Sequence, residues 1–333
     1  MLRSPIAAIL AVALLVSACA AQFRLPGPAQ TSAELDGDHW RAVDGARLPV
    51  RAWEPAGRPV AVIVALHGMN DYSNAFDEPG RALAAKGIAV YAYDQRGFGK
   101  GPHPGYWSSG QAMAADVRSV ARLVADRHPG VPLYLLGESM GGAVAMVAVA
   151  VDPPPEVKGL ILSAPAVWGR STMGVFERAA LWLAYQVAPG WELTGQGLHI
   201  RPSDNIAMLR KLSADPLVIK STRVDAIEGL VDLMDQASEA ASADRLPTLV
   251  LVGAKDEIIP ADSMWSTVVA LPDLGRSQRV ALYSDGWHML LRDLQAAKVE
   301  DDIAHWIADP AQPLPSGADA NAGAELRKRA GRP

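Results

Sequence analysis

Short apolar runs alternate along most of the chain with longer segments whose apolar residues recur at helical spacing. The runs typical of buried strands are residues 60–67, 89–94, 131–138, 158–164, 248–254 and 279–284. Each ends near a glycine, a proline or another turn residue. Residues 39–55 alternate around Asp44-Gly45, which predicts an opening hairpin. The alternation of strands and helices predicts an α/β fold with a mostly parallel sheet and helices on both faces.

The regular spacing breaks after residue 166, and about 80 residues pass before the next predicted strand. This stretch has helical periodicity, above all in residues 176–190 and 224–240. We therefore expect one large domain with a core of residues 37–166 and 246–308. A helical insertion of residues 167–245 interrupts that core.

Composition limits the classes of protein to which the chain can belong. With 333 residues, 50% hydrophobic residues and a net charge of −5, it can bury a sizeable core, and its charge does not favour nucleic acid. It carries no zinc-type cluster of cysteine and histidine, no phosphate-binding loop and no dinucleotide fingerprint. We expect no nucleic-acid partner, no metal and no cofactor. Nothing in the pattern indicates an oligomeric state.

The N-terminus has the pattern of a secretion signal. Arg3 gives a positive start, and residues 6–16 form an apolar stretch too short to span a bilayer. Small residues then precede Cys19, the only cysteine of the chain. The letters LVSAC resemble the lipobox of bacterial lipoproteins, which implies a signal peptide of residues 1–18 and a lipid on Cys19. The alternative is an ordinary secretory signal that is cut near residues 18–21.

This resemblance implies a protein of the bacterial cell envelope, held to the membrane through lipidated Cys19. Such lipoproteins often carry an aspartate after the cysteine when they stay in the inner membrane. Ala20 stands there instead, which favours the outer membrane, facing the periplasm. Residues 19–36 are rich in proline, glycine and small residues and predict a tether. Residues 309–333 are polar and rich in proline and predict a disordered tail.

Residues 137–141 read GESMG and fit the pattern G-x-S-x-G. In this pattern a sharp turn from strand to helix exposes the serine oxygen at the edge of a sheet. The context agrees, because an apolar strand precedes Ser139 and an alanine-rich helix pattern follows it. A chance match is the alternative, since small residues around a serine are common. We interpret Ser139 as a candidate nucleophile, which needs a base beside it.

Two later strands end in residues that could activate a serine. Asp256 follows the strand at 248–254, and His288 follows the strand at 279–284. The chain order of serine, acid and histidine is the order of the α/β-hydrolases. His288 would accept the serine proton, and Asp256 would orient the imidazole. Glu257 is a nearby rival for the acid.

An acyl-transfer site also needs donors for the oxyanion. One candidate is the backbone N–H of Met140, directly after Ser139. The other is the N–H of Met69, in the loop after the strand at 60–67. His67, in the same loop, is a candidate base that precedes the serine. We interpret it as a residue that organises the loop.

Five stretches together resemble one family. They are HGMND at residues 67–71, YAYDQRGFGKG at 91–101, GESMGG at 137–142, GAKDEIIP at 253–260 and DGWHMLL at 285–291. Over roughly residues 37–308 the chain resembles the monoacylglycerol lipase and lysophospholipase-like branch, of serine aminopeptidase S33 type, of the α/β-hydrolase superfamily. The stretch at 91–101 occurs more widely in the superfamily.

The resemblance implies an α/β-hydrolase fold, with a mostly parallel eight-stranded sheet flanked by helices, and a helical lid at residues 167–245. It also implies that the residues matching Ser139, Asp256 and His288 form a catalytic triad. The positions that match Met69 and Met140 supply the oxyanion hole. Asp94 and Arg96 match a structural loop, not catalytic positions.

The expected function is a serine hydrolase that cleaves carboxylic esters of lipid-like substrates, such as monoacylglycerols, lysophospholipids or medium-chain esters, through an acyl-enzyme. The first half of the lid is rich in large apolar residues, which either line a site for an acyl chain or pack helices together. They are Trp168, Met173, Phe176, Trp182, Leu183 and Trp191. The alternatives are an aminopeptidase or amidase on the same triad and a non-catalytic envelope protein.

Overall fold

The computed structural model describes residues 20–150, 153–197 and 199–330. Within this part of the chain, nine strands form one sheet in the order β1-β2-β3-β5-β4-β6-β7-β10-β11. The strands are β1 (Glu34–Asp36), β2 (His39–Arg41), β3 (Arg47–Trp53), β4 (Ala61–Leu66), β5 (Ile88–Tyr93), β6 (Leu133–Glu138), β7 (Val157–Ser163), β10 (Thr248–Gly253) and β11 (Gln278–Tyr283). Every pair from β5 through β11 is parallel.

The described sheet therefore has one strand more than the eight that the family resemblance implies. The difference lies at the opening of the chain, where β1, β2 and β3 form an antiparallel meander and β3 runs antiparallel to β5. Two tight turns make the meander possible. Gly37 and Gly45 sit in them with φ of 63° and 83°, a conformation that favours glycine.

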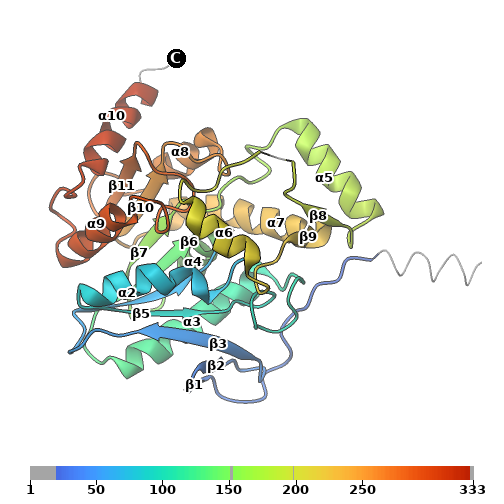
Figure 1. Cartoon of the computed structure of the whole chain (residues 1–333), viewed down its shortest axis with the longest axis horizontal. Coiled ribbons are helices and arrows are strands. Elements are labelled where there is room, and N and C mark those ends of the chain that lie inside the picture. The colour runs from blue at the N-terminus through green and yellow to red at the C-terminus, as the bar shows by residue number, and fades with distance from the viewer. Residues whose placement is uncertain (1–19, 151–152, 198, 331–333) are drawn as a thin grey trace, which may run out of the picture.

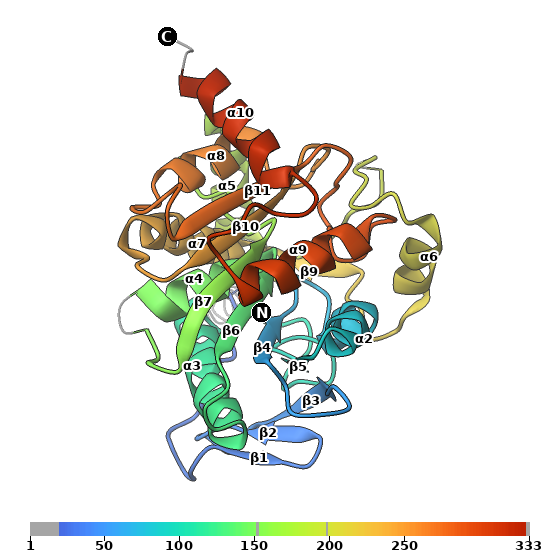
Figure 2. The same ribbon diagram turned by 90° about the vertical axis from the view of Figure 1, so that its left-hand side faces the viewer.

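Alternate residues of the central strands point to two different helical layers. In β4, Ile63 packs with α2 (Asp77–Ala85) and α9 (Ala296–Ala308), whereas Val64 packs on the opposite face. That face is covered by α3 (Gly110–Arg127), α4 (Met140–Ala150) and α8 (Ala261–Val269). Figure 2 shows the strands between these two layers. Because both faces are covered, β4, β5, β6 and β10 are buried along their whole length, as continuous apolar runs predict.

The insertion between β7 and β10 contains strands as well as helices. Its elements are α5 (Val175–Val187), β8 (Glu192–Thr194), α6 (Ile206–Ala214), β9 (Ser221–Arg223), α7 (Val224–Ala240) and the 3₁₀ turn η2 (Ala241–Ala243). β8 and β9 pair as a small antiparallel sheet. α7 packs on α4 and α3, whereas α5 and α6 contain no buried residue. In Figure 1, α5 projects from the body of the domain.

The C-terminal segment forms a helix, α10 (Ala318–Ala330), in place of the disordered tail that its composition predicts. Leu314, Ala318 and Ala322 are buried, and α10 packs against β11. Arg279 on β11 pairs with Asp319. These few apolar anchors and the ion pair hold a segment whose sequence is otherwise polar.

The N-terminal segment is also in contact with the domain and is not a free tether. The backbone N–H of Gln22 donates to Asp225 at 3.0 Å, and that of Arg24 donates to the carbonyl of Trp107 at 2.8 Å. Cys19 and the signal peptide of residues 1–18 lie outside the described residues. None of the helices that the structure describes is long and apolar enough to cross a membrane.

Candidate active site

Ser139 occupies a strained turn between β6 and α4. Its φ is 53°, in the left-handed region that a serine rarely adopts. The turn fits only because of its flanking glycines. A Cβ on Gly137 would lie 2.4 Å from the carbonyl oxygen of Gly141, and a Cβ on Gly141 would lie 2.1 Å from that of Leu66. The backbone of Ser139 is braced by a 2.9 Å hydrogen bond from its N–H to the carbonyl of Ser163 at the end of β7.

The loop after β4 runs directly beside the serine. A Cβ built on Gly68 would lie 3.4 Å from the Cβ of Ser139. Met69, the second of the predicted oxyanion donors, follows Gly68 and packs half-buried against the core. Met140, the first of the predicted donors, is the first residue of α4. Both predicted donors therefore lie in segments adjacent to the serine, one of them at a helix N-terminus, where N–H groups lack partners within the helix.

His67 is fixed in the loop by three hydrogen bonds. Its Nε2 accepts the N–H of Gln95 at 3.0 Å, so its Nδ1 carries the proton and donates to the carbonyl of Gly68 at 2.9 Å. The side chain of Gln95 donates in turn to the carbonyl of His67. Complete burial lowers the pKa of His67. A neutral imidazole with both nitrogens occupied organises the loop and leaves no free base.

The structure joins His288 to Asp256. The Nδ1 of His288 donates to Oδ2 of Asp256 at 2.9 Å, and both side chains are buried. The other carboxylate oxygen accepts the backbone N–H groups of Ile258 and Ile259 at 2.8 and 3.1 Å. With Nδ1 donating, Nε2 is the nitrogen of the imidazole that can accept a proton.

Glu257, the rival acid, points elsewhere. It is exposed and accepts the backbone N–H of Arg201, in the insertion, at 2.7 Å. Asp94 and Arg96 likewise have local structural partners. Asp94 accepts the N–H groups of Ser73 and Lys100, which agrees with the loop role that the resemblance implies.

The loop that carries His288 is held to the insertion. Asp293 accepts the N–H of Trp287 at 2.7 Å and the hydroxyl of Ser203 at 2.5 Å. Burial raises the pKa of Asp293 to about 6. The N–H of Met289 donates to the carbonyl of Pro202 at 3.0 Å. Segments about 90 residues apart in the chain therefore share one small framework around the histidine.

Three charged residues beside the site escaped the sequence reasoning. Arg292 bonds to Asp71 at 2.8 Å and to Glu138, and all three side chains are less than 10% exposed. Burial opposes the charge on the guanidinium, but the carboxylates of Glu138 and Asp71 outweigh it and raise the pKa of Arg292. The sequence offers only a weak indication of this cluster. Each of the three residues lies in or beside a catalytic motif, but nothing in the sequence shows that they pair.

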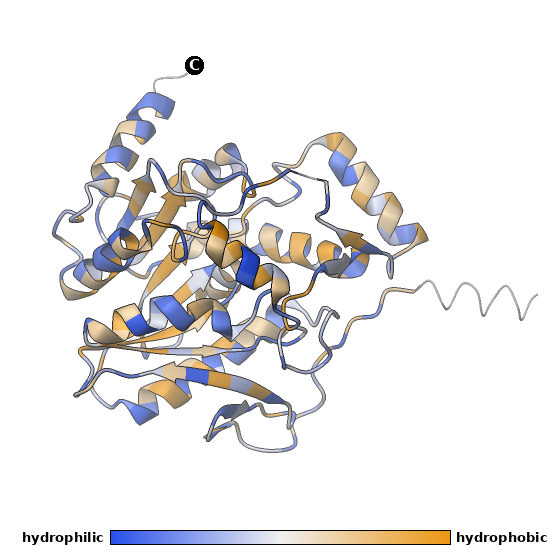
Figure 3. Cartoon of the chain, viewed as in Figure 1, coloured by the Kyte–Doolittle hydropathy of each residue, from blue (hydrophilic) through white to orange (hydrophobic). Residues whose placement is uncertain are grey.

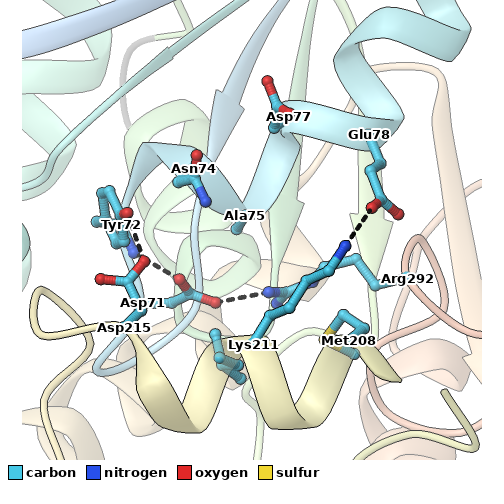
Figure 4. A pocket seen from close by; sticks show the side chains of 11 residues that line it. Asp71, Tyr72, Asn74, Ala75, Asp77, Glu78, Met208, Lys211, Asp215 and Arg292 are labelled. Carbon is cyan, nitrogen blue, oxygen red and sulfur yellow. Dashed lines mark hydrogen bonds and ion pairs between the residues drawn. The ribbon is translucent and has the colours of Figure 1, made fainter. Parts of the chain in front are cut away.

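A cavity of about 180 Å³ opens between α6 and the segment formed by α2 and the 3₁₀ turn η1 (Ser73–Phe76). Its charged and polar lining includes Asp71, Tyr72, Glu78, Lys211, Asp215 and Arg292. Figure 4 shows Asp71, Asp215 and Glu78 each facing a partner within the cavity wall. Tyr72 donates to Asp215 at 2.7 Å, and Arg292 pairs with Asp71. The described residues contain no cluster of three His, Cys, Asp or Glu that could hold a metal ion.

Comparison with known proteins places this geometry in a family. The family model for the serine aminopeptidases S33 matches residues 57–295. The monoacylglycerol lipase of Mycolicibacterium smegmatis is 28% identical over 272 residues, which cover 80% of this chain and 94% of that protein. Human monoglyceride lipase is 27% identical over 290 residues, which cover 81% of this chain and 89% of that protein.

Solved structures share the fold. The crystal structure of a monoacylglycerol lipase from Paleococcus ferrophilus aligns with a TM-score of 0.66 at 22% identity, over 78% of this chain and 98% of that one. A monoglyceride lipase from Saccharomyces cerevisiae, in complex with a substrate analogue, aligns with a TM-score of 0.68 at 18% identity, over 85% of this chain and 98% of that one. The expected α/β-hydrolase fold is therefore correct.

Proposed function

We propose that this chain, which belongs to the serine aminopeptidase S33 family of α/β-hydrolases and is a carboxylic ester hydrolase, cleaves lipid-like esters through an acyl-enzyme on Ser139. The substrate class is monoacylglycerols, lysophospholipids or medium-chain esters. The observations that support the mechanism are the buried hydrogen bond between His288 and Asp256 and the positive φ of Ser139. A binding module needs neither feature.

The geometry suits acyl transfer in two steps. His288 Nε2 takes the hydroxyl proton of Ser139 as Oγ attacks the ester carbonyl, and Asp256 holds the imidazole and stabilises its charge. The N–H groups of Met69 and Met140 stabilise the oxyanion. The imidazolium gives the proton to the departing alcohol. Water, deprotonated by the same imidazole, then attacks the acyl carbon, and the imidazolium returns the proton to Ser139 Oγ as the acyl–serine bond breaks and the acid leaves.

The exposed surface of α5 supports a lipid-like substrate. Val175, Phe176, Trp182, Leu183 and Val187 are each more than half exposed. Such a concentration of large apolar side chains on a solvent-exposed helix face is typical of an interaction site. A lid with this surface suits substrates presented in micelles or bilayers.

The amide-cleaving alternative finds less support. Recognition of a substrate amine needs an unpaired acid near the lid. In the cavity beside α6, Asp215 is engaged by Tyr72 and Asp71 by Arg292. These acids already have partners, which favours the ester over the amide.

We further propose that Cys19 is lipidated and anchors the protein in the bacterial envelope, at the outer membrane facing the periplasm. Gln22, which is bonded to Asp225, lies three positions after Cys19, and a span of three residues reaches at most roughly 10 Å. The N–H of Asp225 also donates to the carbonyl of Pro189, just after α5. In Figure 1 the chain leaves the domain on the side of β8 and β9. A lipid on Cys19 would therefore hold the exposed lid against the anchoring membrane.

A fluorophosphonate probe tests the serine chemistry. We expect the wild-type protein to be labelled and Ser139→Ala and His288→Ala to lose labelling and ester hydrolysis while they remain folded. Ser242→Ala, at an exposed serine in the turn η2, serves as the matched control and should be labelled at the wild-type rate. Ser139→Ala activity within about tenfold of wild type would contradict the assignment.

A substrate series tests the bond and the acyl chain. Fatty-acyl esters of increasing length are compared with aminoacyl amides under one set of conditions. We expect hydrolysis of the esters, with the highest kcat/KM at medium or long chains. Preferential cleavage of the amides would favour the aminopeptidase alternative.

Metabolic labelling with radioactive palmitate tests the anchor. Wild type should carry label and fractionate with membranes, whereas Cys19→Ala should lose both. A shortened form that begins at Gln22 should be soluble and active on short esters. Equal membrane retention without label in either full-length form would contradict lipidation.

A further inference from the structure

Arg292, Glu138 and Asp71 form a buried cluster, named here the arginine clamp, at the point where three loops meet. Glu138 is the last residue of β6 and directly precedes Ser139. Asp71 lies two residues after Met69, and Arg292 lies four residues after His288. Each member therefore belongs to a different segment of the proposed site.

The clamp also touches the oxyanion loop through its backbone. Oε1 of Glu138 would lie 3.9 Å from a Cβ on Gly68, and the N–H of Asp71 donates to the carbonyl of Gly68 at 3.3 Å. The N–H of Arg292 donates to the carbonyl of Met289, which closes the turn after the histidine. The side chains and the backbone together connect the three loops at one place.

A planar guanidinium is suited to this position. It can donate to two carboxylates in fixed directions at once, whereas a lysine ammonium is a single point charge on a flexible stem. In the clamp one terminal nitrogen of Arg292 bonds to Asp71 and the other to Glu138. A shift of either carboxylate would break one of these bonds, so the arginine fixes their separation.

We propose that Arg292 is a positioning residue that holds the serine turn, the oxyanion loop and the histidine loop in register for acyl transfer. This inference rests on the proposed function, because it assigns Arg292 to the reaction at Ser139. Arg292 acts through Glu138 and Asp71 and does not itself touch the substrate. Its contribution should appear in kcat, since a displacement of about 1 Å among reacting groups can cost about a hundredfold in rate.

The molecule supplies a matched control whose side chain bonds outside the clamp, although the residue before it, Gln95, bonds to His67. Arg96 is also buried between two carboxylates, Asp44 and Asp116, with side chains less than 10% exposed. It joins the N-terminal meander to α3 and touches none of the three loops through these bonds. Arg96→Lys and Arg292→Lys therefore remove the same fork from two similar surroundings.

The experiment compares both lysine variants with wild type on a soluble short-chain ester and with the fluorophosphonate probe. We expect Arg292→Lys to lower kcat and the labelling rate about tenfold to a hundredfold with a smaller change in KM. Arg96→Lys should stay within about twofold in both, even if the two variants lose similar stability to urea. Equal kcat losses in the two variants, or none in Arg292→Lys, would overturn the proposal.

Nuclear magnetic resonance gives a readout that does not depend on turnover. The proton on His288 Nδ1, bonded to Asp256, should resonate far downfield, and Arg292→Lys should shift or broaden it whereas Arg96→Lys should not. An unchanged signal in Arg292→Lys would overturn the proposal even in a protein without esterase activity. If the wild-type protein is not labelled by the fluorophosphonate probe, the proposed function is overturned instead. The two failures are therefore distinguishable. If Arg292→Lys does not fold, Glu138→Gln takes its place in both measurements. Glutamine has the shape of glutamate but lacks the charge that pairs with Arg292.

Discussion

The two long helices of the insertion have opposite surroundings. α7 carries five acidic residues, yet nine of its residues are buried, and it packs on α3 and α4. α5 has only two charged residues and a run of large apolar ones, yet none of its residues is buried. Figure 3 shows the hydrophobic positions along α5 on a helix that stands away from the body.

The insertion is therefore not one uniform lid. α7 contributes Val231, Leu233 and Met234 to the main core and is part of the domain. Among the described residues, the segment from α5 to β9 adds no fully buried hydrophobic side chain to that core, and only Leu181 and Ile219 pack against it partly buried. The apolar content of a helix in this protein does not decide its burial; whether the apolar face meets another element does.

A matched pair of leucines tests this comparison and should give the largest effect. Leu233→Ala on α7 empties a fully buried position and should cost about 2–5 kcal/mol of stability. Leu183 on α5 is 56% exposed, so Leu183→Ala should stay within about 0.5 kcal/mol. Urea denaturation measures both. Equal losses would mean that α5 is packed against another surface in solution.

A glycine on α7 gives a smaller effect. A Cβ at Gly229 would lie 2.3 Å from the indole of the buried Trp107. The overpacking from Gly229→Ala should cost about 1–3 kcal/mol, more than the gain of about 1 kcal/mol in helix propensity. Gly195→Ala has no atom within 4 Å of its new Cβ and is the control. If Gly229→Ala is more stable than wild type, α7 can shift away from Trp107 at little cost.

The exposed helix should respond in activity and not in stability. The double variant Phe176→Gln and Trp182→Gln should reduce hydrolysis of a monoacylglycerol in vesicles roughly three- to tenfold, because burial of apolar side chains in the interface is lost. Hydrolysis of a soluble short ester should not change. The control double variant replaces Val43 and Val60, which are exposed elsewhere. A similar loss in the control, or on the soluble ester, would contradict a specific role of α5.

The smallest effect concerns a buried carboxyl group on a core helix. Burial raises the pKa of Glu300, on α9, from 4.5 to about 7. As the pH rises from 4.5 to about 7, the unfolded chain releases this proton while the folded protein retains it, so stability falls across that window. Glu300→Gln should therefore gain on the order of 1 kcal/mol at pH 8 and nothing at pH 4.

Thermal unfolding at the two pH values measures this gain. Glu177→Gln, on exposed α5, controls for the removal of one negative charge. An equal gain at both pH values would trace the effect of Glu300→Gln to packing and not to the proton.

Local pattern was sufficient to locate most of the sheet. The six apolar runs correspond to β4, β5, β6, β7, β10 and β11. A run of buried residues between turns is a property of adjacent positions, so the sequence contains it. The placement of Ser139, Asp256 and His288 after three of these strands is local in the same sense. Parallel strands bring their ends to one edge, which made the pairing of His288 with Asp256 predictable.

Which charges meet depends on the tertiary structure and could not be predicted from local pattern. Arg292 lies 154 residues from Glu138 and 221 from Asp71, and nothing in the chain indicates these partners. The same reason explains the polar tail that forms α10, and the N-terminal segment bonded to Asp225. It also explains why α7 is buried and α5 is exposed. Hydrophobic periodicity is a property of residues close together in the sequence, whereas burial and ion pairing depend on which surfaces the completed fold brings together.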